Sequence, residues 1–597
     1  MDNVFIPKQF NTYADTFLML GIARLLERYL PDRDGSLQIC DRHTHFQLKL
    51  AAPLDLNQLE TLPYEHPFLT VRGGKTDWSK MPELDPVVIF DTVAQAEQRK
   101  IYRAALYQRK SAKQGTESDP IPPDSRTQNG VFLTSQRCDR NHNSLWLDSW
   151  QRQEHYGALM TALFTALDQP AAQFPSLAIA QQYQKITGQS LPKPVGAVKI
   201  YLPNAVQGVN RIKADSNKVD SQKTDWLILW LIANGFFEFA IAERVKIADG
   251  VYDWRVVAAT PKDISLAYYR SVLRTLRSLH PPSGGHGSAR FDSELVLKLC
   301  QELLEYCTLS QTSTLFSFHL APPALLGTLQ GTHFNSKGQV YGVKELFSLG
   351  LPHWMQPQTM EDCQGYLTVI AEHLQIVQGL KVEEGHSELL LAYRTFITSS
   401  DLRQFFPFMV QYADYLVSQL ASFDTRRRSN PKARNPALFS ISGLNLMVKA
   451  DIKITTIVEN PSFLRIAKAI NQATVYAGKI QTKAGTLELD WQRQYGLAQL
   501  LSSQASSKTE FVSAIADFIS KYAHENMRLQ ERYLNTDQVL KRIQVTTDDL
   551  NGLIHLLETH NTTLVANLLI AYGYARWSTK KDLDSLETSD PESDLDS

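Results

Sequence analysis

The sequence predicts an α+β fold, in which a mixed α/β N-terminal region precedes a mainly α-helical C-terminal bundle. Apolar and polar residues alternate from Leu37 to Leu50, as they do in half-buried strands. Asp249-Gly250 separates two apolar stretches, and both residues tolerate the positive φ angles of a type I′ hairpin turn. Beyond about residue 264, apolar residues recur at helical spacing instead. The chain has 597 residues, several times the usual domain length, so two to four domains are expected.

The mixed N-terminal domain is predicted to span residues 1–263. Thr12 and Asp15 can accept hydrogen bonds from backbone N–H groups that lack partners in a first helical turn, so a helix should begin here. Pro86–Phe90 is a candidate for a short strand. The alternation from Val198 to Leu202 predicts another strand, with a long loop after it.

Residues 264–434 are predicted to form a mainly helical middle region. The segment Ile264–Leu279 has one apolar face and ends shortly before Pro281-Pro282, as a helix would. Residues 424–436 read DTRRRSNPKARNP and combine bases with prolines, which predicts an exposed basic linker. This linker is the best candidate for a domain boundary.

Residues 437–579 are predicted to form a C-terminal helical bundle. Asn460 can cap a helix in which Pro461 takes the first position, where its missing N–H is harmless. Ser507 with Glu510 has the spacing of a capping box, and the segment from Thr546 repeats the device. Residues 580–597 are expected to be a disordered acidic tail.

The near-zero net charge of the chain is a sum of unlike parts. The formal charge is −1, but residues 582–597 hold seven acids and no base, so the remaining residues carry +6. The excess is local: residues 99–113 contain six bases and no acid. Composition therefore excludes a uniformly basic coat, but it does not exclude a nucleic-acid partner.

Cysteine content and hydropathy predict a cytoplasmic protein. Five cysteines is a sparse and odd number for this length, which argues against a disulfide framework. Residues 1–15 have no basic-then-apolar leader, so no signal peptide is expected. The longest apolar run, Trp226–Ala242, is short and contains Asn234, Gly235 and Glu238, so it is predicted to be core and not a membrane span.

Known catalytic and metal-binding motifs are incomplete in this sequence. Gly74-Lys75-Thr76 lacks the earlier glycine of a phosphate-binding loop. His386-Ser387 lacks the final glycine of a nucleophile elbow, although a hydrolase that uses these two residues remains an alternative. Cys40, His43 and His45 have no fourth ligand nearby, and a polar strand face is the favoured interpretation. No enzyme activity, metal or cofactor is therefore predicted.

Basic and amide side chains in three segments are the candidates for nucleic-acid contact, because bases neutralise phosphates and amides can reach base edges. They are Asn204, Gln207, Asn210, Arg211, Lys213 and Lys218 after the predicted strand; Arg270, Arg274 and Arg277 on one helix ridge; and Arg426, Arg427 and Arg428 in the basic linker. Two alternatives remain open: an ordinary solvated loop in the first case, and pairing of the ridge with acids from another segment in the second.

Several stretches resemble the large subunit of type I CRISPR Cascade complexes, the eighth Cas family, and in particular its type I-B-like branch. They are FNTYADTFLMLGIARLLERYL near the N-terminus, YLPNAVQGVNRIKAD after the predicted strand, and ENPSFLRIAKAINQATVY with QYGLAQLL and FVSAIADFISKYAHEN near the C-terminus. They are spread over most of the chain and are loose patterns, not invariant signatures.

The resemblance implies a non-catalytic subunit that contacts the 5′ handle of the crRNA and reads the protospacer-adjacent motif of target double-stranded DNA. It implies stabilisation of the R-loop, contacts with the backbone, handle-binding and small Cascade subunits, and recruitment of a nuclease-helicase or of transposition proteins. The C-terminal bundle would resemble the small subunit, which internal initiation at Met447 could also produce. A protein-interaction adaptor without nucleic-acid contacts is the alternative from another class.

Overall fold

The computed structural model describes most of the chain. The described residues are 1–30, 37–73, 78, 81–111, 120–205, 223–282, 287–309, 321–337, 340–382, 385–429, 436–476, 479–481, 487–489, 493–534 and 542–577. The predicted acidic tail and most of the predicted 204–225 loop lie outside them. The fold is α+β, as predicted, with the larger sheets in the N-terminal half and helices dominating the C-terminal half.

The chain divides into two compact units, Met1–Leu351 and Pro352–Ser597. This division differs from both predicted boundaries. Residue 263 lies inside strand β10, Asp263–Ser265, so the sequence boundary at 263/264 would cut a sheet. The predicted linker begins within helix α13, Phe405–Ser429, because the bases of this segment continue the helix and its prolines come only after residue 429.

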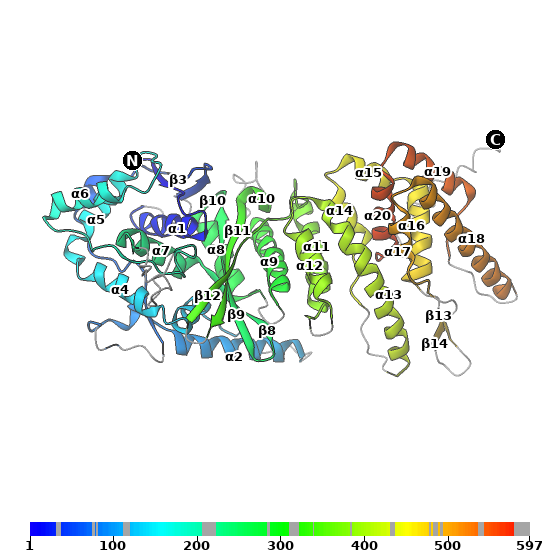
Figure 1. The fold of residues 1–597 in the computed structure, drawn as a ribbon, viewed down its shortest axis with the longest axis horizontal. Coiled ribbons are helices and arrows are strands. Elements are labelled where there is room, and N and C mark those ends of the chain that lie inside the picture. Colours follow the sequence, from blue (N-terminus) through cyan, green and yellow to red (C-terminus); the bar gives the residue numbers. More distant parts are fainter. Residues whose placement is uncertain are drawn as a thin grey trace, which may run out of the picture. The chain divides into compact units, whose positions relative to one another are not determined.

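Two antiparallel four-stranded sheets organise the first unit (Figure 1). The smaller has the order β1-β3-β2-β10, with β1 Asn3–Pro7, β2 Leu37–Asp41 and β3 His45–Leu50. The larger has the order β12-β11-β9-β8, with β8 Ile241–Ala248, β9 Val251–Pro261, β11 Leu326–Lys337 and β12 Val340–Leu349. Strands β11 and β12 were not predicted and show that the region after residue 264 is not mainly helical throughout.

The helices of the first unit pack around these sheets. They are α1 Tyr13–Glu27, α2 Thr92–Ser111, α3 Thr127–Ser135, α4 Asp139–Trp150, α5 Tyr156–Ala166, α6 Ser176–Thr187, α7 Trp226–Phe239, α8 Leu266–Ser278, α9 Ser288–Leu309 and α10 Pro322–Leu325. Short pairs of strands, β4 Thr70–Arg72 with β5 Ile89–Asp91 and β6 Val195–Gly196 with β7 Lys223–Thr224, complete the unit.

Local sequence signals correctly place several of these elements. The Thr12 hydroxyl accepts from the N–H of Ala14, and the Asp15 carboxylate accepts from the N–H groups of Gln9 and Asn11, so α1 begins where predicted. Gly250 has φ 72° in the tight turn between β8 and β9, as the hairpin signal requires. The start of β5 confirms only the end of the predicted Pro86–Phe90 strand.

The predicted strand at Val198–Leu202 is a turn. The N–H of Leu202 donates to the Val198 carbonyl at 2.8 Å, which closes the chain on itself instead of leaving the carbonyl for a neighbouring strand. Val198, Ile200, Tyr201 and Leu202 are all buried, so the alternation did not reflect one buried and one exposed face. A period-two pattern predicts a strand only where one face is buried and the other is exposed, so it was misleading for this fully buried segment.

A buried charge network ties α9 to the larger sheet. The Arg255 guanidinium on β9 donates to the Asp292 carboxylate on α9 at 2.7 Å and to Nδ1 of His333 on β11 at 2.9 Å. Nε2 of His333 then donates to Asp253 at 2.8 Å. A buried guanidinium needs such partners, because an unpaired charge in the core is strongly destabilising.

The second unit is a helical bundle (Figure 1). Its helices are α11 Met360–Gly379, α12 Ser387–Ile397, α13, α14 Ile441–Val448, α15 Ile452–Val458, α16 Pro461–Thr474, α17 Leu497–Gln504, α18 Lys508–Tyr533, α19 Thr547–Thr559 and α20 Thr562–Gly573, with a small hairpin of β13 Lys479–Gln481 and β14 Leu487–Leu489. The predicted cap of α16 and the predicted capping box of α19 are confirmed. At α18 only half of the predicted box forms, because the Ser507 hydroxyl accepts from the N–H of Glu510 while the N–H of Ser507 donates to the Gln504 carbonyl. Met447 is buried inside α14, and α13 packs against α17 and α20, so a product beginning at Met447 would lack part of this bundle.

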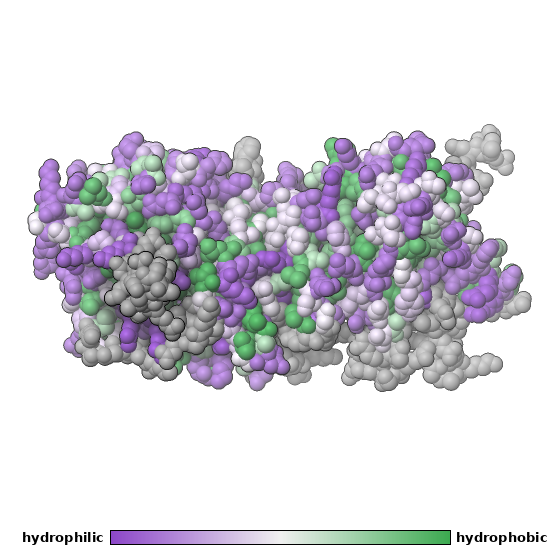
Figure 2. Space-filling view, viewed as in Figure 1, coloured by the Kyte–Doolittle hydropathy of each residue, from purple (hydrophilic) through white to green (hydrophobic). Residues whose placement is uncertain are grey.

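On the face shown in Figure 2, hydrophilic and hydrophobic residues are interspersed among the described residues. In the described part of the chain, none of the helices combines the length and the apolar character that crossing a bilayer would need. The apolar run that begins at Trp226 is the buried helix α7, as predicted.

Helices α1 and α7 cross through two glycines. A Cβ atom added to Gly21 would lie 2.0 Å from the Leu231 carbonyl oxygen, and one added to Gly235 would lie 2.0 Å from the Phe17 carbonyl oxygen. Both contacts are with backbone, which cannot move aside as a side chain can. The Asn234 side chain donates to the Gly21 carbonyl at 3.0 Å across the same crossing.

Gly21→Ala is expected to destabilise the protein by about 1–3 kcal/mol, because overpacking of the crossing outweighs the gain of roughly 1 kcal/mol that alanine usually brings to a helix. The midpoint of denaturant unfolding measures this. Gly379→Ala, at the end of α11, is the control, since an added Cβ there meets nothing within 4 Å. An unchanged or higher midpoint for Gly21→Ala would show that the helices can separate without cost.

Candidate nucleic-acid interface

The arginine groove is a cavity of about 570 Å³ beside α8 in the first unit. Helix α8 starts at a cap in which the Ser265 hydroxyl accepts from the N–H of Tyr268, and its apolar face is buried. The ridge formed by Arg270, Arg274 and Arg277 lines the groove. The lining residues are Pro122, Pro123, Asp124, Ser125, Arg126, Glu238, Arg270, Arg274, Thr275, Arg277, Ser278 and Leu279. Four arginines thus face two carboxylates, which leaves the lining with a positive excess.

Arg270 is held by an ion pair with α1. Its two terminal nitrogens donate to the two carboxylate oxygens of Glu27, at 2.8 and 2.5 Å. Glu27 is buried at the end of α1, so this bidentate pair supplies the partner that a buried carboxylate requires. The acid that pairs with this ridge therefore comes from a segment 243 residues away. The alternative of pairing within the chain is confirmed for Arg270.

Arg277 binds the end of α7. Its guanidinium donates to the carbonyl of Glu238 at 2.7 Å, to the carbonyl of Ala240 at 3.2 Å and to the Ser125 hydroxyl at 3.2 Å. Carbonyls at a helix end lack intrahelical donors and carry partial negative charge, so a cation satisfies both needs. Burial lowers the pKa of Arg277 to about 10, which still leaves the guanidinium charged near neutral pH.

Glu238 is the shared carboxylate of the groove. Its oxygens lie 3.4 Å from Arg126 and 3.7 Å from Arg24. Burial alone would raise the pKa of Glu238, but the charges of Arg24, Arg126 and Arg277 outweigh it and hold the pKa below its usual range. Arg126 also forms a two-point pair with Asp124, at 3.0 and 2.8 Å. These contacts neutralise most of the charge of Arg126 inside the fold.

Arg274 differs from the other arginines of the groove. It is exposed, and within the described part of the chain no hydrogen bond or ion pair holds its side chain. Arg274 comes four residues after Arg270 and three before Arg277 on α8, so it lies on the same ridge. Arg274 is therefore the arginine whose charge is available to a ligand in the groove.

The other predicted contact residues do not join this groove among the described residues. Asn204 is exposed and its side-chain amide donates to the Phe10 carbonyl at 3.1 Å. Gln207, Asn210, Arg211, Lys213 and Lys218 lie outside the described residues. Arg426, Arg427 and Arg428 belong to the last turns of α13 in the second unit, and their side chains also lie outside the description.

The sequence did not indicate Asp124, Arg126 or Glu238 as site residues. Asp124 and Arg126 lie in residues 115–130, which are rich in turn-forming residues, and Glu238 lies in the apolar run of α7. The near neighbours Asp124 and Arg126 could have suggested an ion pair. Nothing local could have shown that this pair meets Arg277 and Glu238.

The motifs weighed for catalysis and metal binding have structural roles where they are described. Nδ1 of His386 accepts from the N–H of Lys381 at 3.1 Å, and Ser387 begins α12. His43 does not lie in a strand with His45, because it occupies the turn between β2 and β3 with φ 62°. The Cys40 thiol lies 3.7 Å from an Asp263 oxygen. Lys75 and Thr76 lie outside the described residues.

A second groove, of about 650 Å³, lies between α17 and α18 in the second unit. Its charged lining residues are Glu510, Asp517 and Lys521, so it carries no positive excess. A polyanion would not be attracted to it. The arginine groove is therefore the better candidate for phosphate binding.

No protein-family model matches the chain, and no curated protein shows a significant match to its sequence. The arginine groove must therefore be interpreted from its own geometry and charge.

Arg277→Met is expected to lower the free energy of unfolding by about 1–3 kcal/mol, because the carbonyls of Glu238 and Ala240 lose their buried donor. Arg274→Met on the same ridge is the matched control and should change stability by no more than about 0.5 kcal/mol. Denaturant unfolding measures both. If both substitutions lowered the free energy of unfolding equally, the assignment of Arg277 to stability and of Arg274 to ligand binding would be contradicted.

Proposed function

We propose that the first unit binds the phosphate backbone of nucleic acid along the arginine groove. The observation that carries this proposal is Arg274, an exposed arginine without a partner among the described residues, on a ridge whose other arginines are fixed. A phosphate that enters the groove would meet a positive lining in which Arg270 and Arg277 are already positioned. Contacts with phosphates do not depend on base identity, so a groove of this kind would set the register of a bound strand and not read its sequence.

We place this binding in a non-catalytic large subunit of a type I, I-B-like Cascade complex in the cytoplasm. The resemblance of the sequence supports this role, with the crRNA 5′ handle and target double-stranded DNA as ligands and the other Cascade subunits as partners. The stretch FNTYADTFLMLGIARLLERYL contains α1, which contributes Glu27 to the support of the groove. Recruitment of a nuclease-helicase or of transposition proteins would follow target recognition.

Arg274→Glu is expected to weaken nucleic-acid binding and to reduce the slope of log K against log salt by about 1, since one phosphate contact is lost. The assay is filter binding with the full chain assembled with its guide RNA and neighbouring gene products, with guide RNA and target duplex labelled separately. Arg140→Glu on α4 makes the same charge change on the exposed surface outside the groove and should leave the slope unchanged.

Equal slopes for Arg274→Glu and the unaltered protein would contradict phosphate binding in the groove. A change confined to the labelled guide RNA or to the labelled target duplex would show which of the two occupies the groove. If Arg274→Glu instead abolishes retention of a protein partner while nucleic-acid binding persists, the groove serves an adaptor that meets acidic protein surfaces.

Charge reversal of both Arg211 and Lys213 tests the sequence-based part of the proposal separately. The resemblance assigns these residues to nucleic-acid contact, so filter binding should show a lower affinity for target duplex and a shallower salt slope. The same double substitution should leave the unfolding midpoint near that of the unaltered protein. Unchanged affinity and slope would remove these residues from the interface while leaving the arginine groove untouched.

A further inference from the structure

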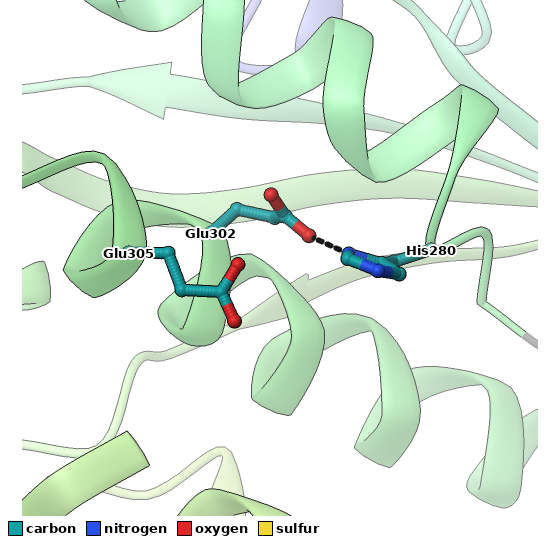
Figure 3. A group of neighbouring side chains, drawn as sticks. All are labelled: His280, Glu302 and Glu305. Atoms are coloured by element: carbon teal, nitrogen blue, oxygen red, sulfur yellow. Dashed lines mark hydrogen bonds and ion pairs between the residues drawn. The ribbon is translucent and has the colours of Figure 1, made fainter. Parts of the chain in front are cut away.

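Three side chains that favour metal ions meet at the junction of α8 and α9. His280 follows the end of α8, while Glu302 and Glu305 lie one turn apart on α9. One ligand atom from each residue can be chosen so that all three lie within 4.8 Å of one another. Figure 3 shows the imidazole and the two carboxylates directed toward a common space, with an interaction drawn between His280 and Glu302.

The negative charges of Glu302 and Glu305 are not balanced by the neighbouring Lys298. Lys298, one turn before Glu302, donates to the Pro281 carbonyl at 2.8 Å and pairs with Glu294 at 3.1 Å. Glu302 is only 3% exposed and depends on the imidazole of His280, while Glu305 accepts from the amide of Gln301 at 2.7 Å. The carboxylates of Glu302 and Glu305 thus lie close together beside one imidazole, which is an arrangement that a divalent cation stabilises.

The backbone around the cluster is held by independent contacts. The ring of Tyr268 on α8 stacks on that of Tyr306 on α9 with centroids 4.0 Å apart, and its hydroxyl donates to the Leu303 carbonyl at 2.6 Å. The Lys298 contact with Pro281 fixes the segment that follows His280. The side chain of His280 is 43% exposed, so an ion can reach the cluster from solvent.

We propose that His280, Glu302 and Glu305 form a binding site for Zn²⁺. One imidazole nitrogen and two carboxylate oxygens are ligands that zinc accepts, and water would complete a four-coordinate shell. The imidazole favours a transition metal over Mg²⁺ or Ca²⁺, which prefer oxygen ligands. The bound ion would join the end of α8 to α9. This site is separate from the arginine groove and does not depend on nucleic-acid binding.

The test is metal binding by the full chain after removal of metals with a chelator. Calorimetric titration with Zn²⁺ should show one site that Glu305→Gln weakens by about tenfold or more, since a ligand is lost. Titration with Co²⁺ should give visible d–d absorption that the same substitution removes. His280→Ala should change the zinc affinity and the Co²⁺ absorption in the same way as Glu305→Gln. Circular dichroism checks that each variant is folded.

His555→Ala is the matched control. His555 also contacts a glutamate, Glu558 at 3.1 Å, but this exposed pair has no third ligand among the described residues and should not contribute to the site. Zinc affinity and the Co²⁺ spectrum should be unchanged in this variant. Identical titrations for the unaltered protein, Glu305→Gln and His280→Ala would overturn the proposal and leave His280 and Glu302 as a simple ion pair. Glu305 is partly exposed, so its substitution keeps the test open even if His280→Ala unfolds.

Discussion

The close crossing of α1 and α7 is the constraint on which the first unit and its groove depend. Gly21 and Gly235 let the two backbones approach until no Cβ atom fits between them. The Asn234 amide then donates to the Gly21 carbonyl, and its carbonyl oxygen accepts from Arg24 at 2.7 Å. A contact between backbones fixes both the distance and the rotation of the helices, since neither can slide without a clash or a lost hydrogen bond.

This crossing brings the buried carboxylate of Glu27 and the partly buried carboxylate of Glu238 close to the arginines of α8. Glu27 ends α1, and Glu238 lies in the last turn of α7. Each must be paired, because an isolated charge in a low-dielectric surrounding is costly. Arg270 and Arg126 satisfy these needs, while Arg277 binds the carbonyls at the end of α7. The positive lining of the groove is therefore partly a consequence of how the two helices pack.

Elements defined by neighbouring residues were predicted from sequence, whereas those defined by distant partners were not. Thr12 with Asp15 marks the start of α1, and Asp249-Gly250 marks a hairpin, because caps and tight turns depend on a few adjacent residues. Strand β11 was missed, since it pairs with β9, at least 65 residues earlier in the chain. Strand β12 was missed with it, because it joins the sheet at the edge by pairing with β11. The predicted linker at 424–436 was wrong in its first half, where α13 continues.

The same distinction applies to the candidate site. Helical spacing alone correctly placed Arg270, Arg274 and Arg277 on one ridge, because that depends only on the period of the helix. It could not reveal that Glu27 neutralises Arg270 across 243 residues of chain, or that Arg277 caps α7. Nor could it join His280 to Glu302, although these residues are only 22 positions apart, because the period of one helix does not show how the next helix packs against it.

Helix α8 is anchored at several points, and this arrangement bears on the role of Arg274. Arg270 ties its middle to α1, Arg277 ties its last turn to α7, and His280 joins the segment beyond it to α9. An arginine on such a helix loses only its own side-chain freedom when a ligand binds, because the backbone that carries it is already ordered. One available charge on a rigid support can therefore contribute more to binding than several on a flexible loop, where each contact would also have to order the chain. In the proposed binding, the fixed arginines would add to the positive field of the groove, because Glu27 and the end of α7 already set their positions.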